Sequence, residues 1–372
     1  MDPLALAQAL VRCPSVTPEE GGALRLLAAA LDAEGFHCRR VDRGGVANLL
    51  ARRGPAGAAR TLAFAGHTDV VPPGDRALWS CDPFGGELRD GHLWGRGAAD
   101  MKSGVAAMAA AAARAALPPD GALLLLVTGD EEGEARDGTL ALLDALPAPP
   151  DACVVGEPTS VERLGDTVKV GRRGSLTARL AARGRQGHAA YPERALNPIP
   201  ALARLLDRLA SHRLDEGSGP FGPSTLALTT VDVGNPASNV IPAEARATLN
   251  VRFNDRHTGA SVAAWIAGEA ARVEAETGVA IALETREGAE PFRTPPGPFT
   301  DLVAAAVRET GVEPALSTSG GTSDARFIAK VCPVVELGLV GPTMHQADER
   351  VEAAQVGALA GLYGRVIRGF FA

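Results

Sequence analysis

The sequence predicts an α/β domain that is interrupted by a smaller, inserted α+β domain. The first observation is a set of short, continuous apolar runs, such as residues 122–127, which are typical of strands buried on both faces of a sheet. The second is a change of pattern near Gly174, after which the expected order is strand–helix–strand–strand–helix–strand. The third is the return of the buried pattern after about Gly288. We therefore expect one discontinuous domain over 1–173 and 289–372, and an insertion over 174–288.

Leucine and alanine recur with helical spacing in the first part of the chain, and turn residues separate the elements. Gly35 stands where a helix C-cap is expected, and Asp90-Gly91 is typical of a hairpin turn. The Pro-Pro-Asp-Gly stretch at 118–121 ends an alanine-rich helix that begins within 100–104. The expected helices are 2–12, 20–35, about 100–116 and one from about 138, and the expected strands are 48–52, 61–65, 122–127 and 152–155, with a hairpin over 85–97.

Strand and helix patterns also alternate in the inserted segment and at the end of the chain. The order within the insertion is the ferredoxin-like split βαβ pattern. Its expected strands are 176–180, 224–233, 243–253 and 279–285, and its expected helices are 197–211 and 261–276. Beyond it we expect a helix over 299–310, a strand over 334–339 and a closing helix over about 352–370.

Length and composition argue against a nucleic-acid or membrane protein. The chain has 372 residues, of which 46% are hydrophobic and 22% charged, and its formal net charge of −7 comes from interspersed acids and bases. No basic stripe predicts nucleic-acid binding, and the longest apolar stretch, 105–113, is too short to cross a bilayer. No signal peptide is expected at the N-terminus. Because the 5 cysteines are scattered and form no CxxC pair, we expect neither a disulfide framework nor a thiolate zinc site, and we expect a cytoplasmic location.

A histidine and an aspartate follow the predicted strand at 61–65. His67 and Asp69 are two residues apart, and side chains at that spacing on an extended segment point the same way. A histidine ligates a metal better when a carboxylate holds its second ring nitrogen. We interpret His67 as a metal ligand and Asp69 as the residue that orients it. The alternative is a strand that merely ends in polar residues.

Acidic residues recur at the same kind of position elsewhere in the chain. Glu131 and Glu132 follow one predicted strand, Glu157 follows the next, and Asp100 lies between the hairpin and a helix. In open α/β sheets ligands bind beyond the carboxyl ends of the strands, so we expect these side chains to converge. Carboxylates with imidazoles suit Zn²⁺ or Co²⁺, and two cations would relieve the mutual repulsion of the acids. The pattern therefore predicts a two-metal site that activates water for hydrolysis.

Each of these residues has an ordinary structural interpretation when it is taken alone. A Glu-Glu pair after a strand can be a solvated helix start, Glu157 can be a loop residue, and His345 can be a surface histidine. Residues 95–100 are not a dinucleotide fingerprint because Asp stands at the last position. Ser319-Gly320-Gly321 lacks the GxSxG elbow of a serine hydrolase. Only the combination of acids and histidines favours the metal site.

Several longer stretches make the sequence similar to a known family. They are 66–74, 95–102, 130–132, 156–158, 165–175, 186–192, 239–244 and 320–324. With them the sequence resembles the dinuclear-zinc aminoacylase and carboxypeptidase family called M20, along essentially the whole chain. Within the family it most resembles the members that hydrolyse N-succinyl-LL-2,6-diaminopimelate in lysine biosynthesis. The resemblance implies a zinc-peptidase-like catalytic domain with a central mixed sheet, and an inserted dimerisation or lid domain.

The resemblance also implies how the metal ligands are shared. It implies two Zn²⁺ ions per subunit, with Co²⁺ able to replace Zn²⁺ in one site. Asp100 would bridge the two ions. His67 and Glu157 would complete one site, and Glu132 and His345 would complete the other.

A general base, a partner subunit and substrate contacts are implied in the same way. Glu131 would take a proton from the attacking water and pass it to the leaving amine. The inserted domain would form a homodimer, in which His188 helps to stabilise the tetrahedral intermediate in the partner subunit's active site. Substrate contacts are implied for Lys169, Arg172, Ser175, Tyr191, Asn239, Arg252 and Thr322.

Two positions depart from the pattern of the members that act on the succinylated substrate. Ser238 stands where those members carry the first of two asparagines, and Gly341 stands where they carry an asparagine shortly before the last metal histidine. The metal ligands are unaffected, but the preference for a succinyl over an acetyl group stays open. The alternatives are therefore an acetylornithine deacetylase, a dipeptidase, and a non-catalytic binding protein that keeps the fold.

Overall fold

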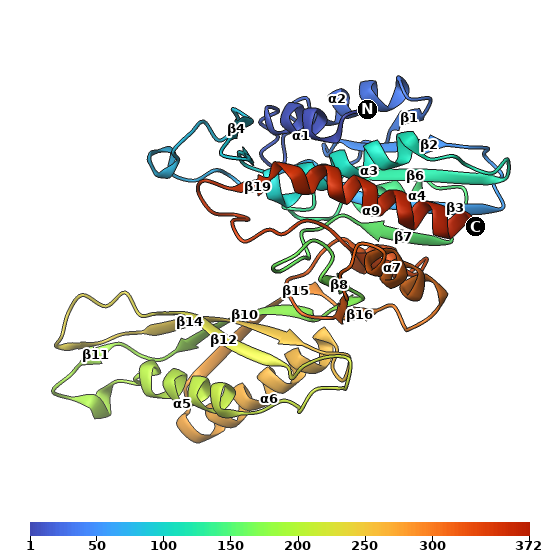
Figure 1. The fold of residues 1–372 in the computed structure, drawn as a ribbon. Coiled ribbons are helices and arrows are strands. Elements are labelled where there is room, and N and C mark those ends of the chain that lie inside the picture. Colours follow the sequence, from blue (N-terminus) through green and yellow to red (C-terminus); the bar gives the residue numbers. More distant parts are fainter. The chain divides into compact units, whose positions relative to one another are not determined.

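The computed structural model describes residues 1–372, and its chain forms two compact units (Figure 1). The first unit comprises Met1–Val170, Arg293–Ser317 and Ser323–Ala372. The second comprises Gly171–Phe292 and the short segment Thr318–Thr322. From the sequence, this short segment is expected in the first domain. The structure groups it with the second unit, because its residues form hydrogen bonds there.

A mixed sheet of 8 strands forms the centre of the first unit, in the order β1-β2-β6-β3-β7-β18-β8-β17. β3 is parallel to both β6 and β7, whereas β2 is antiparallel to β6. Every residue of β6 is buried, as its continuous Leu/Val run predicts. The strands are β1 (His37–Arg40), β2 (Asn48–Arg53), β3 (Arg60–His67), β6 (Gly121–Thr128), β7 (Ala152–Val155), β8 (Thr167–Lys169), β17 (Ala315–Ser317) and β18 (Val334–Glu336).

Helices α3 (Ser103–Arg114) and α9 (Ala353–Phe371) lie side by side and both contact β3 (Figure 1). Alanine dominates the buried residues of α3, and small side chains allow the two helices to pack closely. α1 begins at an N-cap, because the Asp2 carboxylate accepts hydrogen bonds from the backbone N–H groups of Leu4 and Ala5. The other elements are α1 (Pro3–Val11), α2 (Ala23–Asp32), α4 (Thr139–Asp144), α7 (Pro298–Arg308), α8 (Ala325–Ile328), and a small sheet of β4 (Glu87–Arg89), β5 (His92–Trp94) and β19 (Arg350–Glu352).

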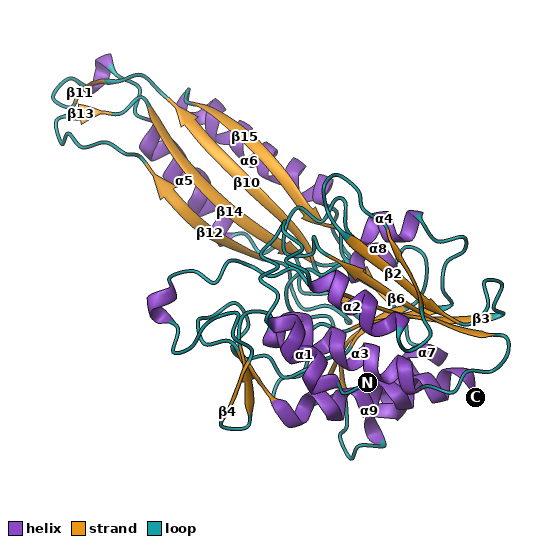
Figure 2. Ribbon diagram, turned by 90° about the horizontal axis from the view of Figure 1, so that it is seen from above, coloured by secondary structure: helices purple, strands orange, loops and turns teal.

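The second unit is built on an antiparallel sheet of 4 strands in the order β12-β14-β10-β15. One face carries α5 and α6, and alternate residues of β10 are buried against these helices (Figure 2). The elements are β10 (Gly174–Arg183), β12 (Thr225–Asp232), β14 (Glu244–Phe253), β15 (Ala280–Ala289), α5 (Pro198–Ser211) and α6 (Gly259–Thr277), with the short pairs β11 (Gly187–His188) with β13 (Val240–Ile241) and β9 (Gly171–Arg172) with β16 (Phe292–Arg293).

The predicted α/β fold with a mixed central sheet is confirmed. One local difference concerns the start of the helix expected at 100–104. Asp100 is extended there, with φ −124° and ψ 101°, and the regular helix begins at Ser103. This extended residue is part of the polar cluster described below. None of the helices combines the length and the apolar character needed to span a bilayer.

Candidate metal centre

Three neighbouring strands end together in the first unit and carry the polar residues that the sequence singles out. His67 is the last residue of β3 and pairs with Thr128, the last residue of β6. β7 lies on the other side of β3 and runs parallel to it, so the loops that follow all three strands meet at one edge. Gly66 favours close packing here, because a Cβ at that position would overlap the terminal methyl group of Met101, whose side chain would have to move. The absence of this Cβ lets the turn that carries Asp100 pack against the end of β3.

Asp100 lies between the two histidines of the cluster. One of its carboxylate oxygens is 3.2 Å from Nε2 of His67, and the other is 3.4 Å from Nε2 of His345. Glu157 lies 3.8 Å from the same nitrogen of His67, and Glu132 lies 2.8 Å from that of His345. The structure thus brings together all the residues predicted as metal ligands. Their donor atoms form two groups that share Asp100, one with His67 and Glu157 and one with Glu132 and His345, and His67, Glu131 and Glu132 form a third group; within each group the atoms lie within 4.8 Å of one another.

Glu131 also lies in this cluster, with a carboxylate oxygen 4.0 Å from Nε2 of His67. Burial raises the pKa of Glu131 well above its ordinary value, and the neighbouring Glu157 raises it further. Burial lowers the pKa of His67, but Asp100, Asp69 and the two glutamates around it raise the pKa well above its ordinary value. The acids around these two groups act in the same direction on both, since a group of close carboxylates attracts positive charge. The cluster is therefore suited to divalent cations.

Asp69 contacts His67 differently from the sequence-based expectation. The backbone carbonyl of Asp69 lies 2.9 Å from Nδ1 of His67, whereas its carboxylate is 3.6 Å away. The carboxylate instead accepts hydrogen bonds from the backbone N–H groups of Glu131 and Glu132, at 3.3 and 3.0 Å. A proton on Nδ1 of His67 can be donated to the carbonyl, which leaves Nε2 facing Asp100. The backbone carbonyl of Asp69 therefore orients His67, and the carboxylate of Asp69 positions the backbone of Glu131 and Glu132.

A buried ion pair lies beside the cluster and is not predicted from the sequence. Arg96 and Glu349 are 2% and 0% exposed, and Nη1 of the arginine donates to the carboxylate at 2.5 Å. The other oxygen of Glu349 accepts the backbone N–H groups of Ala99 and Asp100, at 2.9 and 3.1 Å. Arg96 also donates to the backbone carbonyl of His345, at 3.4 Å. One ion pair thus holds the backbone on both sides of the cluster.

The glutamate pair is positioned by the loop that follows β6. The carboxylate of Asp130 accepts hydrogen bonds from the backbone N–H groups of Glu134, Arg136 and Asp137. This closes the loop around Asp130, next to the glutamate pair. The loop is tied to β2 as well, since Asn48 donates to the carbonyl of Asp137, at 2.8 Å.

The residues predicted to contact substrate fall into separate groups. In the first unit, the ammonium of Lys169 donates to Ser317 at 3.2 Å. In the second unit, Arg252 pairs with Ser175 across β14 and β10 and donates to the hydroxyl of Thr322 at 3.4 Å. Arg172 donates to the carbonyl of Ser319 at 3.5 Å. We call Arg172, Arg173 and Arg252 the arginine cluster.

A further group lies at the opposite end of β10. His188 stacks edge-on against Tyr191 with ring centroids 5.6 Å apart, and the carbonyl of Asn239 accepts the N–H of Ala189. β10 pairs Ser175 with Arg252 near its start and ends at Arg183. At ~3.3 Å per residue the strand separates these two positions by roughly 26 Å. His188 therefore lies far from the arginine cluster of the same chain.

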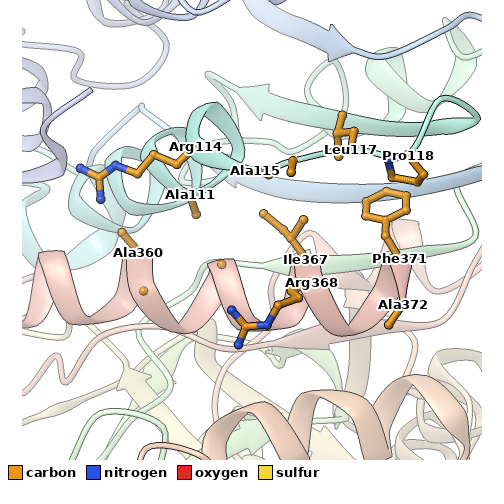
Figure 3. A pocket seen from close by; sticks show the side chains of 13 residues that line it. Ala111, Arg114, Ala115, Leu117, Pro118, Ala360, Ile367, Arg368, Phe371 and Ala372 are labelled. Carbon is orange, nitrogen blue, oxygen red and sulfur yellow. The ribbon is translucent and has the colours of Figure 1, made fainter.

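A hollow of about 680 Å³ in the first unit is distinct from this cluster (Figure 3). It lies between the C-terminal part of α3 and α9, where Ala115 and Ile367 face each other and Arg114 and Arg368 stand at its sides. Its lining contains none of the residues of the two metal-ligand groups. The polar cluster at the strand ends is therefore the candidate site.

Known proteins similar to this chain identify its family. The sequence model of Peptidase family M20/M25/M40 matches residues 63–369. A succinyl-diaminopimelate desuccinylase of Cereibacter sphaeroides is 63% identical over 100% of this chain and 99% of its own length. The protein of the same name from Ruegeria pomeroyi is 58% identical over the full length of both.

Solved structures share the fold at much lower sequence identity. The aminopeptidase PepT of Bacillus cereus superimposes with a TM-score of 0.81 at 20% identity, covering 100% of this chain and 98% of its own. The M20 family metallo-carboxypeptidase Sso-CP2 of Sulfolobus solfataricus superimposes with a TM-score of 0.80 at 16% identity, covering 100% and 99%. The chain therefore belongs to peptidase family M20/M25/M40, as its resemblance predicts.

Proposed function

We propose that the protein hydrolyses N-succinyl-LL-2,6-diaminopimelate to succinate and LL-2,6-diaminopimelate. The observation that carries the proposal is the position of Asp100 between the imidazoles of His67 and His345, with glutamates on both sides. The names of relatives that are 58–63% identical over the whole chain supply the substrate. The reaction breaks the amide bond, adds hydroxide to the succinyl carbonyl and adds a proton to the amine.

We propose that two divalent cations occupy the two donor groups. His67, Asp100 and Glu157 would hold one ion, and Asp100, Glu132 and His345 would hold the other. The donor set of carboxylates and imidazoles fits Zn²⁺, and the sequence-based choice of Zn²⁺, with Co²⁺ able to replace it in one site, stays a prediction. When bound, the ions would supply Lewis acidity toward water and toward the amide carbonyl.

Glu131 is the proposed general base. It lies beside the two groups that share Asp100 and belongs to neither of them, and its carboxylate is also within reach of the donor atoms of His67 and Glu132. It would accept a proton from the attacking water and then donate that proton to the nitrogen of the leaving amine. The N–H group of Glu131 is held by Asp69, so that the base is positioned by its backbone.

The arginine cluster is the proposed site for substrate carboxylates. Arg252 is half-buried, and no carboxylate lies within ion-pair distance of it. Burial lowers the pKa of Arg252 and the nearby Arg173 lowers it further, so a bound anion would relieve an unfavourable arrangement. Ser175 and Thr322 add hydroxyl groups, and a further substrate contact is proposed for Lys169. The succinyl group supplies a carboxylate that an acetyl group lacks.

A homodimer is proposed because His188 lies far from the arginine cluster along β10. Tyr191 and Asn239 accompany this histidine, which would donate a hydrogen bond to the oxyanion that develops in the partner subunit's site. Exposed apolar side chains of Leu228 and Val231 on the edge strand β12 provide a surface for pairing with a second copy. The cytoplasmic location stays a prediction that rests on the scattered cysteines.

The proposal is tested by comparing two amides with protein of measured metal content. We expect release of succinate from N-succinyl-LL-2,6-diaminopimelate to exceed release of acetate from N-acetylornithine, and we expect a chelator to abolish both. Faster acetate release would favour the deacetylase. Absence of turnover on either amide by metal-loaded protein would favour a binding protein.

A further inference from the structure

We infer that Thr318 is a positioning residue for the substrate's acyl carboxylate, and that it acts by anchoring Thr318–Thr322 to a loop of the second unit. That loop, residues 215–224, is called the anchor loop here. The inference rests on the proposed function, because the carboxylate contacts of Arg172, Arg252 and Thr322 belong to that proposal. It adds residues that hold these contacts in place and that bind no substrate atom themselves.

The anchor loop is closed by the carboxylate of Asp215, whose side chain is 5% exposed. This carboxylate accepts hydrogen bonds from the backbone N–H groups of Gly217 and Ser224, at 2.6 and 3.3 Å. It also accepts a hydrogen bond from Nδ2 of Asn254, at 2.6 Å, and it lies 3.1 Å from Nε2 of His257. Asn254 directly follows β14, so the loop is fastened to the strand that carries Arg252.

Asp215 remains ionised over the whole physiological pH range. Burial raises the pKa of Asp215, but hydrogen bonds from Ser224, Gly217 and Asn254 outweigh it and lower the pKa to about 2. The loop is therefore closed by a permanent charge. Phe221, in the same loop, is 2% exposed.

Thr318 connects the anchor loop to the segment that carries Thr322. Its hydroxyl donates to the backbone carbonyl of Pro220 at 2.7 Å, and the residue is 7% exposed. The backbone carbonyl of Ser319, the next residue, accepts the hydrogen bond from Arg172. Thr318 thus lies one residue before the first contact of the segment with the arginine cluster.

The two glycines of the segment make this anchor necessary. Gly320 has φ +105°, a backbone conformation that favours glycine, and a Cβ there would overlap the guanidinium of Arg172 and displace it from the segment. Gly321 follows directly, and consecutive glycines lose more backbone entropy on ordering than other residues. A fixed hydrogen bond at the start of the segment reduces the freedom that substrate binding must remove. Loss of one neutral hydrogen bond corresponds to roughly a two- to tenfold change in an equilibrium constant.

The mechanism predicts an effect on substrate affinity that depends on the acyl group. A mobile segment presents Thr322 and the carbonyl of Ser319 less often in the arrangement seen beside the two arginines. Binding of the succinyl carboxylate should therefore weaken. Turnover of bound substrate depends on residues at the strand ends of the first unit and should change little.

The test compares Thr318→Val, which keeps the shape and removes the hydroxyl, with Thr318→Ser, which keeps the hydroxyl. With metal-loaded dimer, we expect Thr318→Val to raise KM for N-succinyl-LL-2,6-diaminopimelate by about two- to tenfold, with kcat within about twofold of wild type. Thr318→Ser should restore KM. The KM of the matching N-acetyl amine should change less, because it lacks the carboxylate. Hydrogen exchange at the amides of Gly320 and Gly321 should quicken in the valine variant alone.

The outcomes separate the inference from the proposed function. An unchanged KM in Thr318→Val, or a serine variant no better than the valine variant, would overturn the inference while wild-type turnover still supported the function. A wild-type protein without desuccinylase activity would overturn the function. In that case, unchanged exchange at Gly320 and Gly321 in the valine variant would overturn the anchoring as well.

Discussion

The candidate metal centre of the first unit and the arginine cluster of the second are supported in different ways. The metal centre lies where β3, β6 and β7 end, and its side chains follow strands whose register is set by continuous pairing. The arginine cluster is instead contacted by a segment with consecutive glycines, Thr318–Thr322, which Thr318 fastens to the carbonyl of Pro220. The difference teaches that the proposed metal ligands rely on the ends of sheet strands, whereas the proposed substrate contact Thr322 relies on hydrogen bonds between loops.

The comparison is tested most strongly by Glu131→Gln, for which we expect retained metals and a loss of turnover of ~10²–10⁴-fold. The amide keeps the size of the side chain but cannot accept the proton from water. Metal content by atomic spectroscopy and kcat are the measurements. Glu134→Gln, an exposed change in the same loop, is the control and should stay near wild type. Near-normal activity of the metal-loaded Glu131→Gln protein would remove the base from the proposal.

The separation along β10 predicts complementation between two inactive variants. Mixed dimers of His188→Ala and Glu131→Gln subunits should regain about one competent site in two, because one site combines an intact Glu131 with an intact His188 of the partner subunit. The measurement is the specific activity of heterodimers isolated with two different tags. Each variant alone, taken through the same exchange, is the control. Heterodimers as inactive as their parents would place His188 in the site of its own chain.

The buried ion pair of Arg96 and Glu349 beside the metal centre predicts a large loss of stability in Glu349→Gln. The change leaves the buried guanidinium of Arg96 without its counter-charge, which typically costs about 3–5 kcal/mol. We expect a lower Tm and weaker metal retention, because the amide NH2 of glutamine cannot accept the hydrogen bond of Arg96, and the ion pair that holds the backbone near Asp100 is lost. Thermal unfolding and dialysis against a chelator measure the two effects. Glu352→Gln, an exposed neighbour, is the matched control, and an equal effect there would argue against the role of the ion pair.

A smaller, pH-dependent effect on stability is expected for Asp215, which closes the anchor loop. The pKa of Asp215 is lowered from 3.8 to about 2 in the folded chain. Its ionised form therefore stabilises the fold at pH values above about 4, and this contribution is lost as the pH falls through about 2. Asp215→Asn should lower the free energy of unfolding at pH 7. Between pH 4 and pH 2 the free energy of unfolding of this variant should fall less than that of wild type. Urea unfolding at the three pH values measures both effects, and Asp207→Asn is the exposed control.

Much of the candidate site could be predicted because it depends on local sequence. His67, the glutamate pair and Glu157 each follow a buried apolar run, and parallel neighbouring strands bring their ends to one edge. The pattern of the runs identifies β6 and β7 without knowledge of the other strands. The role of Asp69 was predicted only in part, since the spacing indicates a contact with His67 but cannot distinguish its carbonyl from its carboxylate.

The sequence by itself thus determined the α/β fold, the strand ends that carry the polar residues, and the residue types suited to two cations, because hydrophobic period and strand length are local properties. Only the tertiary structure decided which distant residues support them. Arg96 and Glu349 are 253 positions apart, and nothing local in either segment marks them as partners. Thr318–Thr322 belongs by sequence to the first domain, yet it is held by the carbonyl of Pro220. Hydrogen bonds between distant loops depend on where the whole chain places them, and this information is absent from any short stretch.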